Sequence, residues 1–405
     1  MNKLFLLLVV LGFSGTAHAE RWIVKNPRAS LTLFAPLKVL ELGGDSYMVV
    51  DAPAYATLAE FASYGESAFP DARISLPKDL PADDGMEDPD ARMAWHVKAL
   101  QYEKLPAQFN GTGVIVAVVD TGVDYSHPAL VGHIWTNEKE IAGNGIDDDG
   151  NGYIDDIHGW DFELGKNDPM DDNGHGTHCS GIIAASPNAE TRAQGVAPGA
   201  KVMAIRVIGE KSIGFLSDAI AGIKYAVDNG ARVLSNSWRV YKSWGDFDPS
   251  EENIELLKKA ILYAGEHGAV FVAAAGNEAV NLDTDFDKDP MFPGGYMGIS
   301  SLIVVAASDQ RSEPAYFTNY GGSHVGVAAP GVSILSTTPG NNWAAMSGTS
   351  MATPLVAGAV ARGLSANFSP AEIGDKLVNS SSNGGSWGTK IRAKGVVDLM
   401  RYLTP

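Results

Sequence analysis

The sequence predicts an α/β fold, a parallel sheet with helices on both faces, preceded by a small α+β unit. From about residue 92 onward, fully apolar runs alternate with amphipathic stretches. Strands that are apolar along their whole length are typical of parallel sheets buried on both faces. The expected strands are "GVIVAVVD" (113–120), "AKVMAIRV" (200–207), "ARVLSNSW" (231–238), "GAVFVAAAGN" (268–277) and "SLIVVAAS" (301–308), with helices at 216–230 and 253–268.

The first residues, "MNKLFLLLVVLGFSGTAHAE", predict a signal peptide over 1–19. Lys3 gives the positive start, an apolar run follows, and Ala17-His18-Ala19 is a small-residue cleavage pattern before Glu20. The alternative, an N-terminal membrane anchor, needs about 20 apolar residues, and this run is shorter. We therefore expect a secreted protein, extracellular or periplasmic, with no membrane attachment after signal removal.

Residues 20–80 predict a small α+β domain. Short runs such as "RWIVKN" and "SYMVVDAP" flank one helical stretch, "YATLAEFASY" (55–64). The stretch 76–91 is rich in Pro and Asp, and we assign a linker to 81–91. The larger domain then covers 92–405.

Composition excludes some classes of function. The 405 residues carry 30 Lys and Arg against 48 Asp and Glu, a formal charge of −18. Such a surface does not favour nucleic acid or anionic membranes, which need clustered positive charge. The single cysteine, Cys179, cannot form an internal disulfide, so an exported fold must depend on its core and on bound metal.

The stretch "MSGTSMATPLVAG" (346–358) places Ser350 at the start of an expected helix. Ser350 is either a helix cap or a nucleophile that needs a base and an acid elsewhere. No histidine follows it, which excludes the Ser…Asp…His order of α/β-hydrolases. The order Asp…His…Ser remains, with Asp120 at a strand end and His175 at a helix start. Taken singly, Asp120 could complete a turn, and His175 with His178 could bind a metal.

Four segments in order resemble the signatures of the subtilisin-like serine proteases, the subtilases. They are "VVDTGVDYSHPAL", "NGHGTHCSGIIAA", "AAAGN" and "GTSMATPLVAGAVA", and the resemblance covers about residues 88–400. It implies a serine endopeptidase that forms an acyl-enzyme on Ser350, with His175 as the base and Asp120 orienting the imidazole. It also implies that Asn277 donates its amide to the oxyanion.

Two further residues bear on this site. The "GTHCSG" form resembles the proteinase K-like and thiol-containing branches of the family, and we expect Cys179 to be a buried, inert thiol. Pro354 fits a first helical turn, whose N–H groups lack intrahelical partners. The positive end of that helix favours the charge that develops on the attacked oxygen.

The resemblance also implies a groove for extended polypeptide substrates. The segment "GEKSIGFLSD" (209–218) is similar to the family's edge that pairs with substrate backbone. The segment "SNSW" (235–238) and residues 273–276 would wall the first specificity pocket, and Trp238 departs from the smaller residue expected there. The predicted substrate-binding residues are Ser212, Ile213, Gly214, Ser235, Ser237, Ala274 and Gly276.

The stretch "NGIDDDGNGYIDDIHGWD" (144–161) predicts a calcium-binding loop. Its D-x-D-x-N-G spacing matches the start of an EF-hand, but His158 stands where the closing Glu belongs. The alternative is a solvated acidic loop, whose aspartates would repel one another without a cation. A second stretch, "DTDFDKD" (283–289), is a weaker candidate. The predicted ligands are Asp147, Asp149, Asn151, Tyr153 (through its carbonyl), Asp155 and Asp156.

In subtilases a small α+β propeptide precedes the catalytic domain and blocks its groove until it is cut off. Residues 20–80 have that size and position, so we expect the chain's own propeptide to be an intramolecular inhibitor, cleaved within 76–91, of a monomeric enzyme. A retained accessory domain is the alternative. Two other functions remain open: a subtilase-fold transpeptidase, and a catalytically silent, secreted calcium-binding protein.

Overall fold

The computed structural model describes residues 20–28, 31, 35–52, 61, 63–77, 94–240, 249–285, 291–382 and 384–404. The chain divides into two compact units, residues 1–70 and 71–405. The expected signal peptide, almost all of the expected helix at 55–64 and the linker at 81–91 lie outside the described residues. The two units are described separately below.

The first unit is built on an antiparallel sheet in the order β2-β3-β1-β4. Trp22 on β1 is stacked on Phe61, with ring centroids 4.9 Å apart. Both side chains are buried together with Val24 and Val50, which gives the unit its own small core. The strands are β1 (Glu20–Lys25), β2 (Pro36–Leu42), β3 (Asp45–Ala52) and β4 (Ser67–Pro70).

The second unit contains the predicted parallel sheet, in the order β14-β13-β12-β10-β6-β8-β7. All five predicted strands are present, and the prediction of an α/β fold is confirmed. The strands are β6 (Ile115–Asp120), β7 (Gly159–Asp161), β8 (Lys201–Arg206), β10 (Val233–Asn236), β12 (Val270–Ala274), β13 (Leu302–Ser308) and β14 (Val327–Pro330).

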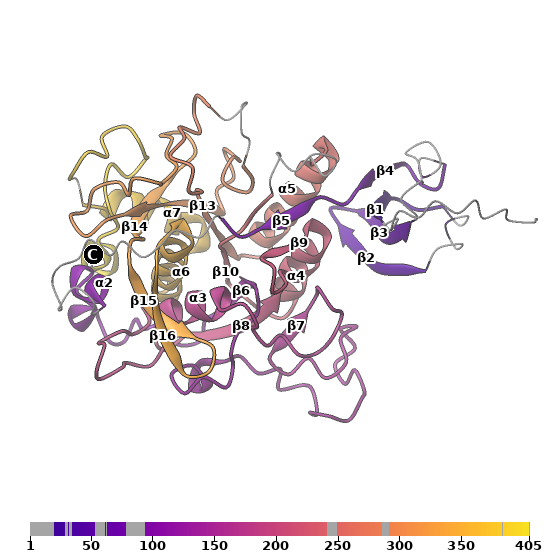
Figure 1. Cartoon of the computed structure of the whole chain (residues 1–405), viewed down its shortest axis with the longest axis horizontal. Helices are drawn as coiled ribbons and strands as arrows, with labels where there is room; N and C mark the ends of the chain where they lie inside the picture. Colours follow the sequence, from indigo (N-terminus) through magenta and orange to yellow (C-terminus); the bar gives the residue numbers. More distant parts are fainter. Residues whose placement is uncertain are drawn as a thin grey trace, which may run out of the picture. The chain divides into compact units, whose positions relative to one another are not determined.

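Helices cover both faces of this sheet, which explains why its strands are apolar along their whole length. Figure 1 shows α3 and α6 on one side of the sheet and α4 and α5 on the other, and each pair packs together. Ser250 caps α5 by accepting a hydrogen bond from Asn253 N at 3.3 Å. The helices are α2 (Trp95–Ala99), α3 (His175–Ala184), α4 (Leu216–Asp228), α5 (Glu251–Glu266), α6 (Thr349–Ser365), α7 (Pro370–Ser380) and α8 (Leu399–Leu403).

Two small sheets complete the unit. The hairpin of β15 (Ile334–Thr338) and β16 (Asn342–Met346) leads directly into α6. A three-stranded sheet pairs β5 (Arg73–Ser75) with β9 (Ile213–Phe215) on one side and β11 (Arg239–Val240) on the other. Residues 73–75, which precede the expected linker, therefore belong to the second unit and form the central strand of this sheet.

Candidate active site

Asp120 is the last residue of β6, at the carboxyl edge of the parallel sheet. Its side chain is fully buried, and its Oδ1 accepts hydrogen bonds from Thr121 N and from His175 Nδ1, each at 2.8 Å. A buried carboxylate needs such partners, because an unpaired one is costly to desolvate. The edge of the sheet thus fixes a charged oxygen against the histidine that the sequence paired with it.

His175 is the first residue of α3, as the sequence predicts. Glycine is needed on both sides of His175, because Gly174 has φ +108° and a methyl group on Gly176 would overlap the carbonyl oxygen of Gly122. Burial lowers the pKa of His175, but the charge and hydrogen bond of Asp120, together with the neighbouring Cys179, outweigh this effect and hold the pKa well above its ordinary value. Asp120 therefore orients the imidazole and stabilises its protonated form.

Ser350 is the second residue of α6 and is 4% exposed. Its Oγ donates to the carbonyl of Ser237 at 3.4 Å. Its own carbonyl accepts from Ser237 Oγ at 3.0 Å and from Cys179 Sγ at 3.5 Å. The start of the helix is thus fixed by side chains from the segment after β10 and from α3.

The interpretation of Pro354 as a first-turn residue is wrong. Because α6 begins at Thr349, Pro354 is its sixth residue, and its missing N–H deprives the carbonyl of Ser350 of a helical partner. The hydroxyl of Ser237 and the thiol of Cys179 supply that carbonyl with donors instead. Because of the proline, the backbone carbonyl of the candidate nucleophile accepts its hydrogen bonds from side chains outside α6.

Asn277 lies three residues beyond β12, next to the start of α6. Its Oδ1 accepts from Thr349 N at 2.9 Å and from Thr349 Oγ1 at 2.8 Å. A methyl group on Gly348 would lie 3.2 Å from Asn277 Nδ2, so this nitrogen points toward the turn that precedes Ser350. The amide end of Asn277 is thereby placed to donate beside the candidate nucleophile.

Cys179 lies one turn beyond His175 on α3 and is fully buried. Its Sγ is 3.9 Å from His175 Nδ1. Burial raises the pKa of the thiol, which favours the uncharged, less nucleophilic form. This agrees with the expectation of a structural thiol.

The segment with the predicted substrate-binding residues 212–214 forms β9 and the turn before it. In the structure, β9 is antiparallel to β5, with Ile74 opposite Gly214 and Ser75 opposite Ile213. The pairing extends to Leu76 N, which donates to Ser212 O at 3.2 Å. A stretch of the chain itself thus occupies this edge as an added strand.

The other four predicted groove residues fall in different places. Ser235 lies inside β10 and Ala274 ends β12, and both side chains are buried, so these two residues are part of the sheet. Ser237 contacts Ser350, and Gly276 N donates to Thr349 Oγ1 at 3.2 Å. Trp238 is 1% exposed, so its indole packs inside the unit.

Sequence reasoning missed the residues that anchor β5. Asp71 is 2% exposed, and its carboxylate accepts from Ser217 N at 3.1 Å and from Ser217 Oγ at 2.6 Å, at the start of α4. Ala72 N donates to Asn253 Oδ1 of α5 at 3.3 Å. An acidic residue that caps a helix can be recognised in a sequence only when it lies close to that helix along the chain. Here 146 positions separate Asp71 from Ser217 at the start of α4.

The predicted calcium loop brings together carboxylates from two segments. One oxygen each from Glu140, Asp147 and Asp149 lie within 4.8 Å of one another. The sequence pattern did not include Glu140, which lies outside the D-x-D-x-N-G run. Its Oε1 accepts from Asp149 N at 3.1 Å and its Oε2 from Asp155 N at 3.0 Å, so it also fixes the loop backbone.

The last two predicted ligands have other partners in this loop. Asp155 accepts three hydrogen bonds, from Gly143 N at 2.7 Å, Asn144 N at 3.2 Å and Gly145 N at 3.0 Å. Asp156 is fully buried and accepts from Asn137 Nδ2 at 2.8 Å, Asn151 Nδ2 at 2.9 Å and the hydroxyl of Tyr225 at 2.5 Å. These contacts give both carboxylates a structural role in shaping the loop.

Two other predicted features of the metal chemistry are only partly described. The ring of Tyr153 packs edge-on against Trp160, with centroids 5.0 Å apart. In the second acidic stretch, Asp283 Oδ1 lies 2.8 Å from His324 Nδ1, and residues 286–289 lie outside the described part of the chain. Neither observation tests the ligand roles.

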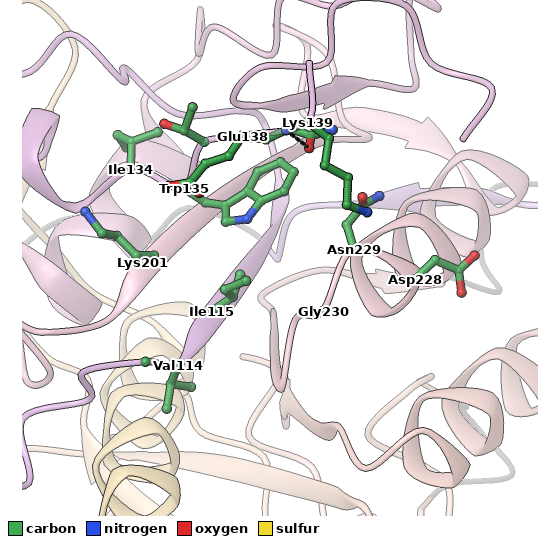
Figure 2. A pocket seen from close by; sticks show the side chains of 13 residues that line it. Val114, Ile115, Ile134, Trp135, Glu138, Lys139, Lys201, Asp228, Asn229 and Gly230 are labelled. Carbon is green, nitrogen blue, oxygen red and sulfur yellow. Dashed lines mark hydrogen bonds between the residues drawn. The ribbon is translucent and has the colours of Figure 1, made fainter. Parts of the chain in front are cut away.

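A hollow of about 650 Å³ lies at the opposite, amino edge of the sheet. Figure 2 shows the indole of Trp135 between Lys201 on one side and Lys139 and Asn229 on the other. The first residues of β6 and β8 line it. Asp120, His175, Ser350 and Asn277 are not among its lining residues, so this concavity is separate from the candidate catalytic residues.

Within the described residues, no helix is long and apolar enough to cross a membrane.

A profile described as "Subtilase family" matches residues 111–395. Over 295 residues the chain is 37% identical to thermitase of Thermoactinomyces vulgaris, covering 72% of this chain and 88% of thermitase. It is 40% identical over 250 residues to a thermophilic serine proteinase of Bacillus sp. (strain AK1), covering 62% of this chain and 52% of that protein. Subtilisin BL of Lederbergia lenta is 33% identical over 310 residues, covering 75% of this chain and 96% of subtilisin BL.

Proposed function

Because the chain belongs to the subtilase family and is a serine-type endopeptidase, we propose that Ser350, His175, Asp120 and Asn277 are its catalytic group. The observation that carries this proposal is the 2.8 Å hydrogen bond between Asp120 Oδ1 and His175 Nδ1, made on a helix that contacts the start of α6. Three strand ends or helix starts, far apart in sequence, bring together a nucleophile, a base and an orienting acid.

In the first half of the reaction, Ser350 Oγ attacks the scissile carbonyl and its proton passes to His175 Nε2. The oxyanion accepts hydrogen bonds from Asn277 Nδ2 and from the free N–H groups at the start of α6. Asp120 accepts from His175 Nδ1, which keeps Nε2 unprotonated before the attack and stabilises the imidazolium after it. When the C–N bond breaks, His175 returns the proton to the leaving amine.

In the second half, water replaces the amine. His175 takes a proton from the water, whose oxygen attacks the acyl carbon, and the ester bond to Ser350 breaks as the proton returns to Oγ. The acid product then leaves the groove.

Substrates would bind as an added strand between β9 and β11. Support comes from β5, an extended segment of the chain itself that makes this antiparallel pairing through its backbone. The side chain of Ile74 in β5 is fully buried, and β5 lies between β9 and β11. A substrate bound in the place of β5 would therefore meet an apolar subsite at this position. Extended polypeptides are therefore the proposed substrate class.

Residues 20–80 are the proposed propeptide, which includes β5 and inhibits the enzyme by occupying its groove. Asp71 and Ala72 hold the start of β5 against α4 and α5. Cleavage within 76–91 would leave β5 as a bound product that must dissociate or be degraded before substrate enters. Removal of residues 1–19 and secretion, as a monomer, complete the proposed maturation.

Calcium is the proposed cofactor of the 140–151 loop. Three carboxylates whose oxygens lie within 4.8 Å of one another repel each other, and hard oxygen ligands of this kind suit Ca²⁺. The ligands would be Glu140, Asp147 and Asp149, with the Asn151 side chain and the Tyr153 carbonyl as further candidates. The ion would cross-link the loop and stabilise the fold, and it takes no part in the reaction.

The test uses the purified full chain incubated with calcium beside its Ser350→Ala variant. We expect the native chain to lose its N-terminal part by cleavage within 76–91 and to react with a fluorophosphonate, and the variant to remain full length and unlabelled. If the processed native protein does not label at Ser350 and hydrolyses no unfolded protein substrate, the proposal is wrong.

A further inference from the structure

Side chains from two segments meet beside the candidate nucleophile. Ser237 and Asn277 both contact the start of α6. Arg239 follows Ser237 by two residues, and Glu278 directly follows Asn277. The guanidinium of Arg239 forms an ion pair with the Glu278 carboxylate, and its Nη1 lies 3.2 Å from the sulfur of Met291. The side chains of Arg239 and Glu278 are only 12% and 20% exposed, although both are charged.

The space beneath this ion pair is filled. A methyl group added to Gly276 would overlap the amide of Asn319 and lie 2.7 Å from Glu278 Oε2 and 3.1 Å from Met291 Cε. Asn319 fixes the arrangement, since its Nδ2 donates to Glu278 Oε2 at 2.8 Å and to Ala275 O at 2.9 Å. Met291 itself is 2% exposed.

The register of β5 relates this cluster to the scissile bond. Ser75 lies opposite Arg239, so two residues further along the antiparallel strands Pro77 comes opposite Ser237. The carbonyl of Ser237 accepts from Ser350 Oγ at 3.4 Å. A substrate residue at this register is therefore next to the nucleophile and is the one that precedes the scissile bond. Because residues two apart on a strand share a face and directly opposed residues point the same way, its side chain lies on the same face of the strands as that of Arg239.

We propose that Arg239, Glu278 and Met291 fill the pocket for the residue that precedes the scissile bond, so that the enzyme selects small side chains there. This inference rests on the proposed function. A large side chain would have to displace a mostly buried ion pair, which leaves charges without partners. The chain's own residue at this register, Pro77, is compact.

The charges of Arg239 and Glu278 argue against a preference for Lys or Arg before the scissile bond. The Glu278 carboxylate could pair with a substrate Lys or Arg, but the guanidinium of Arg239 already neutralises it. A substrate cation would meet this guanidinium as a like charge. Removing Arg239 alone would reverse the situation, because the carboxylate would then lack its cation.

The experiment measures kcat/KM of the calcium-loaded, processed enzyme on peptides Ile-Ser-Leu-X, which copy residues 74–76, with X as Ala, Phe or Lys before the cleaved bond. We expect Ala to exceed Phe and Lys by at least about tenfold, because the larger side chains must displace the ion pair and even one methylene in a pocket changes kcat/KM by about that factor. Arg239→Gly should raise cleavage after Lys at least about tenfold relative to Ala, whereas Arg239→Lys should keep the native order. The Arg239→Gly/Glu278→Gln double variant should favour Phe instead.

Thermal unfolding of each variant confirms that it is folded. The pocket inference is wrong if the native enzyme cleaves equally after Ala, Phe and Lys, or if Arg239→Gly keeps the native order of preference for these residues. Either result leaves the proposed function intact. If the native enzyme cleaves none of the peptides and no unfolded protein, the proposed function fails and this inference fails with it.

Discussion

The two edges of the parallel sheet differ in how their polar groups are arranged. At the carboxyl edge, Asp120 and His175 are buried and aligned on each other, and Ser350 and Asn277 lie at the start of one helix. At the amino edge, a hollow of about 650 Å³ is lined by exposed lysines whose contacts are peripheral (Figure 2). Lys201, for example, donates to the carbonyl of Gly132 at 2.8 Å. Concavity alone therefore does not mark the active site, whereas convergent, desolvated polar groups do.

The largest expected effect tests the carboxyl edge through Asp120→Asn. An amide at this position can donate to His175 Nδ1, which leaves Nε2 protonated and unable to accept from Ser350. We expect kcat to fall by about 10⁴-fold with little change in KM. The measurement is peptide hydrolysis, and the matched control is Glu138→Gln at the amino edge. A loss of less than tenfold in Asp120→Asn would contradict the assigned role.

The same variant should change the pH profile. In the native enzyme, kcat/KM should fall as pH decreases through the raised pKa of His175, because a protonated imidazole cannot take the proton of Ser350. In the variant the charge of Asp120 no longer raises this pKa against the effect of burial, so the acidic limb should move to lower pH. The raised pKa also stabilises the native fold below the ordinary histidine pKa, and this contribution disappears as pH rises through the raised value.

Asn277→Ala should have the next largest effect. It removes one side-chain donor to the oxyanion while the other N–H groups at the start of α6 remain, so we expect kcat to fall by about 10²–10³-fold with KM nearly unchanged. Asn277→Asp is the matched variant, because it keeps the acceptor for Thr349 but presents charge to the oxyanion, and it should be at least as inactive. An Asn277→Ala variant with the same kcat as the native enzyme would show that the amide of Asn277 does not donate to the oxyanion.

These expectations were accessible from the sequence to different degrees. The strands of the parallel sheet and the starts of α3 and α6 follow from local apolar runs and turn residues, and they place Asp120 and His175 correctly. The sequence does not show that Ser235 and Ala274 are buried within strands, because their burial depends on the sheet register. Pro354 was misplaced because α6 begins at Thr349, early enough that the carbonyl of Ser350 is already helical, and a sequence does not fix a helix start to the residue.

The remaining features depend on contacts between distant segments. Glu140 joins Asp147 and Asp149 only because the loop folds back on itself, and no spacing rule connects it to the acidic run. The pairing of β5 with β9 and β11 joins residues about 140 to 165 positions apart. The contacts of Arg239 with Glu278 and Met291 likewise join three segments that no single stretch of sequence brings together.

Removing calcium should have a smaller effect, which acts on the stability of the fold through the 140–151 loop rather than on either edge of the sheet. We expect EDTA to lower the Tm of the processed enzyme by about 3–5 °C, since a ligand at 100 times its Kd contributes about 2.7 kcal/mol and the unfolding entropy is about 2.1 cal/mol/K per residue. Glu140→Gln should reduce the calcium-dependent part of Tm, because it removes one negative charge but retains an acceptor for the loop backbone. Asp375→Asn, an exposed acid paired with Arg392, should keep the full calcium response. A Tm that is unaffected by EDTA in the native enzyme would remove calcium from the proposal.

The smallest effect tests the amino edge directly. Lys201→Ala removes an exposed side chain and its hydrogen bond to Gly132, so we expect a change in unfolding free energy of about 0.5 kcal/mol, or about 1–2 °C in Tm. Because the hollow at this edge contains none of the proposed catalytic residues, kcat/KM should stay within about twofold of the native value, which is less than about 0.5 kcal/mol in the barrier. A tenfold loss of kcat/KM with unchanged Tm would show that the amino edge influences the reaction, and the contrast between the two edges would no longer hold.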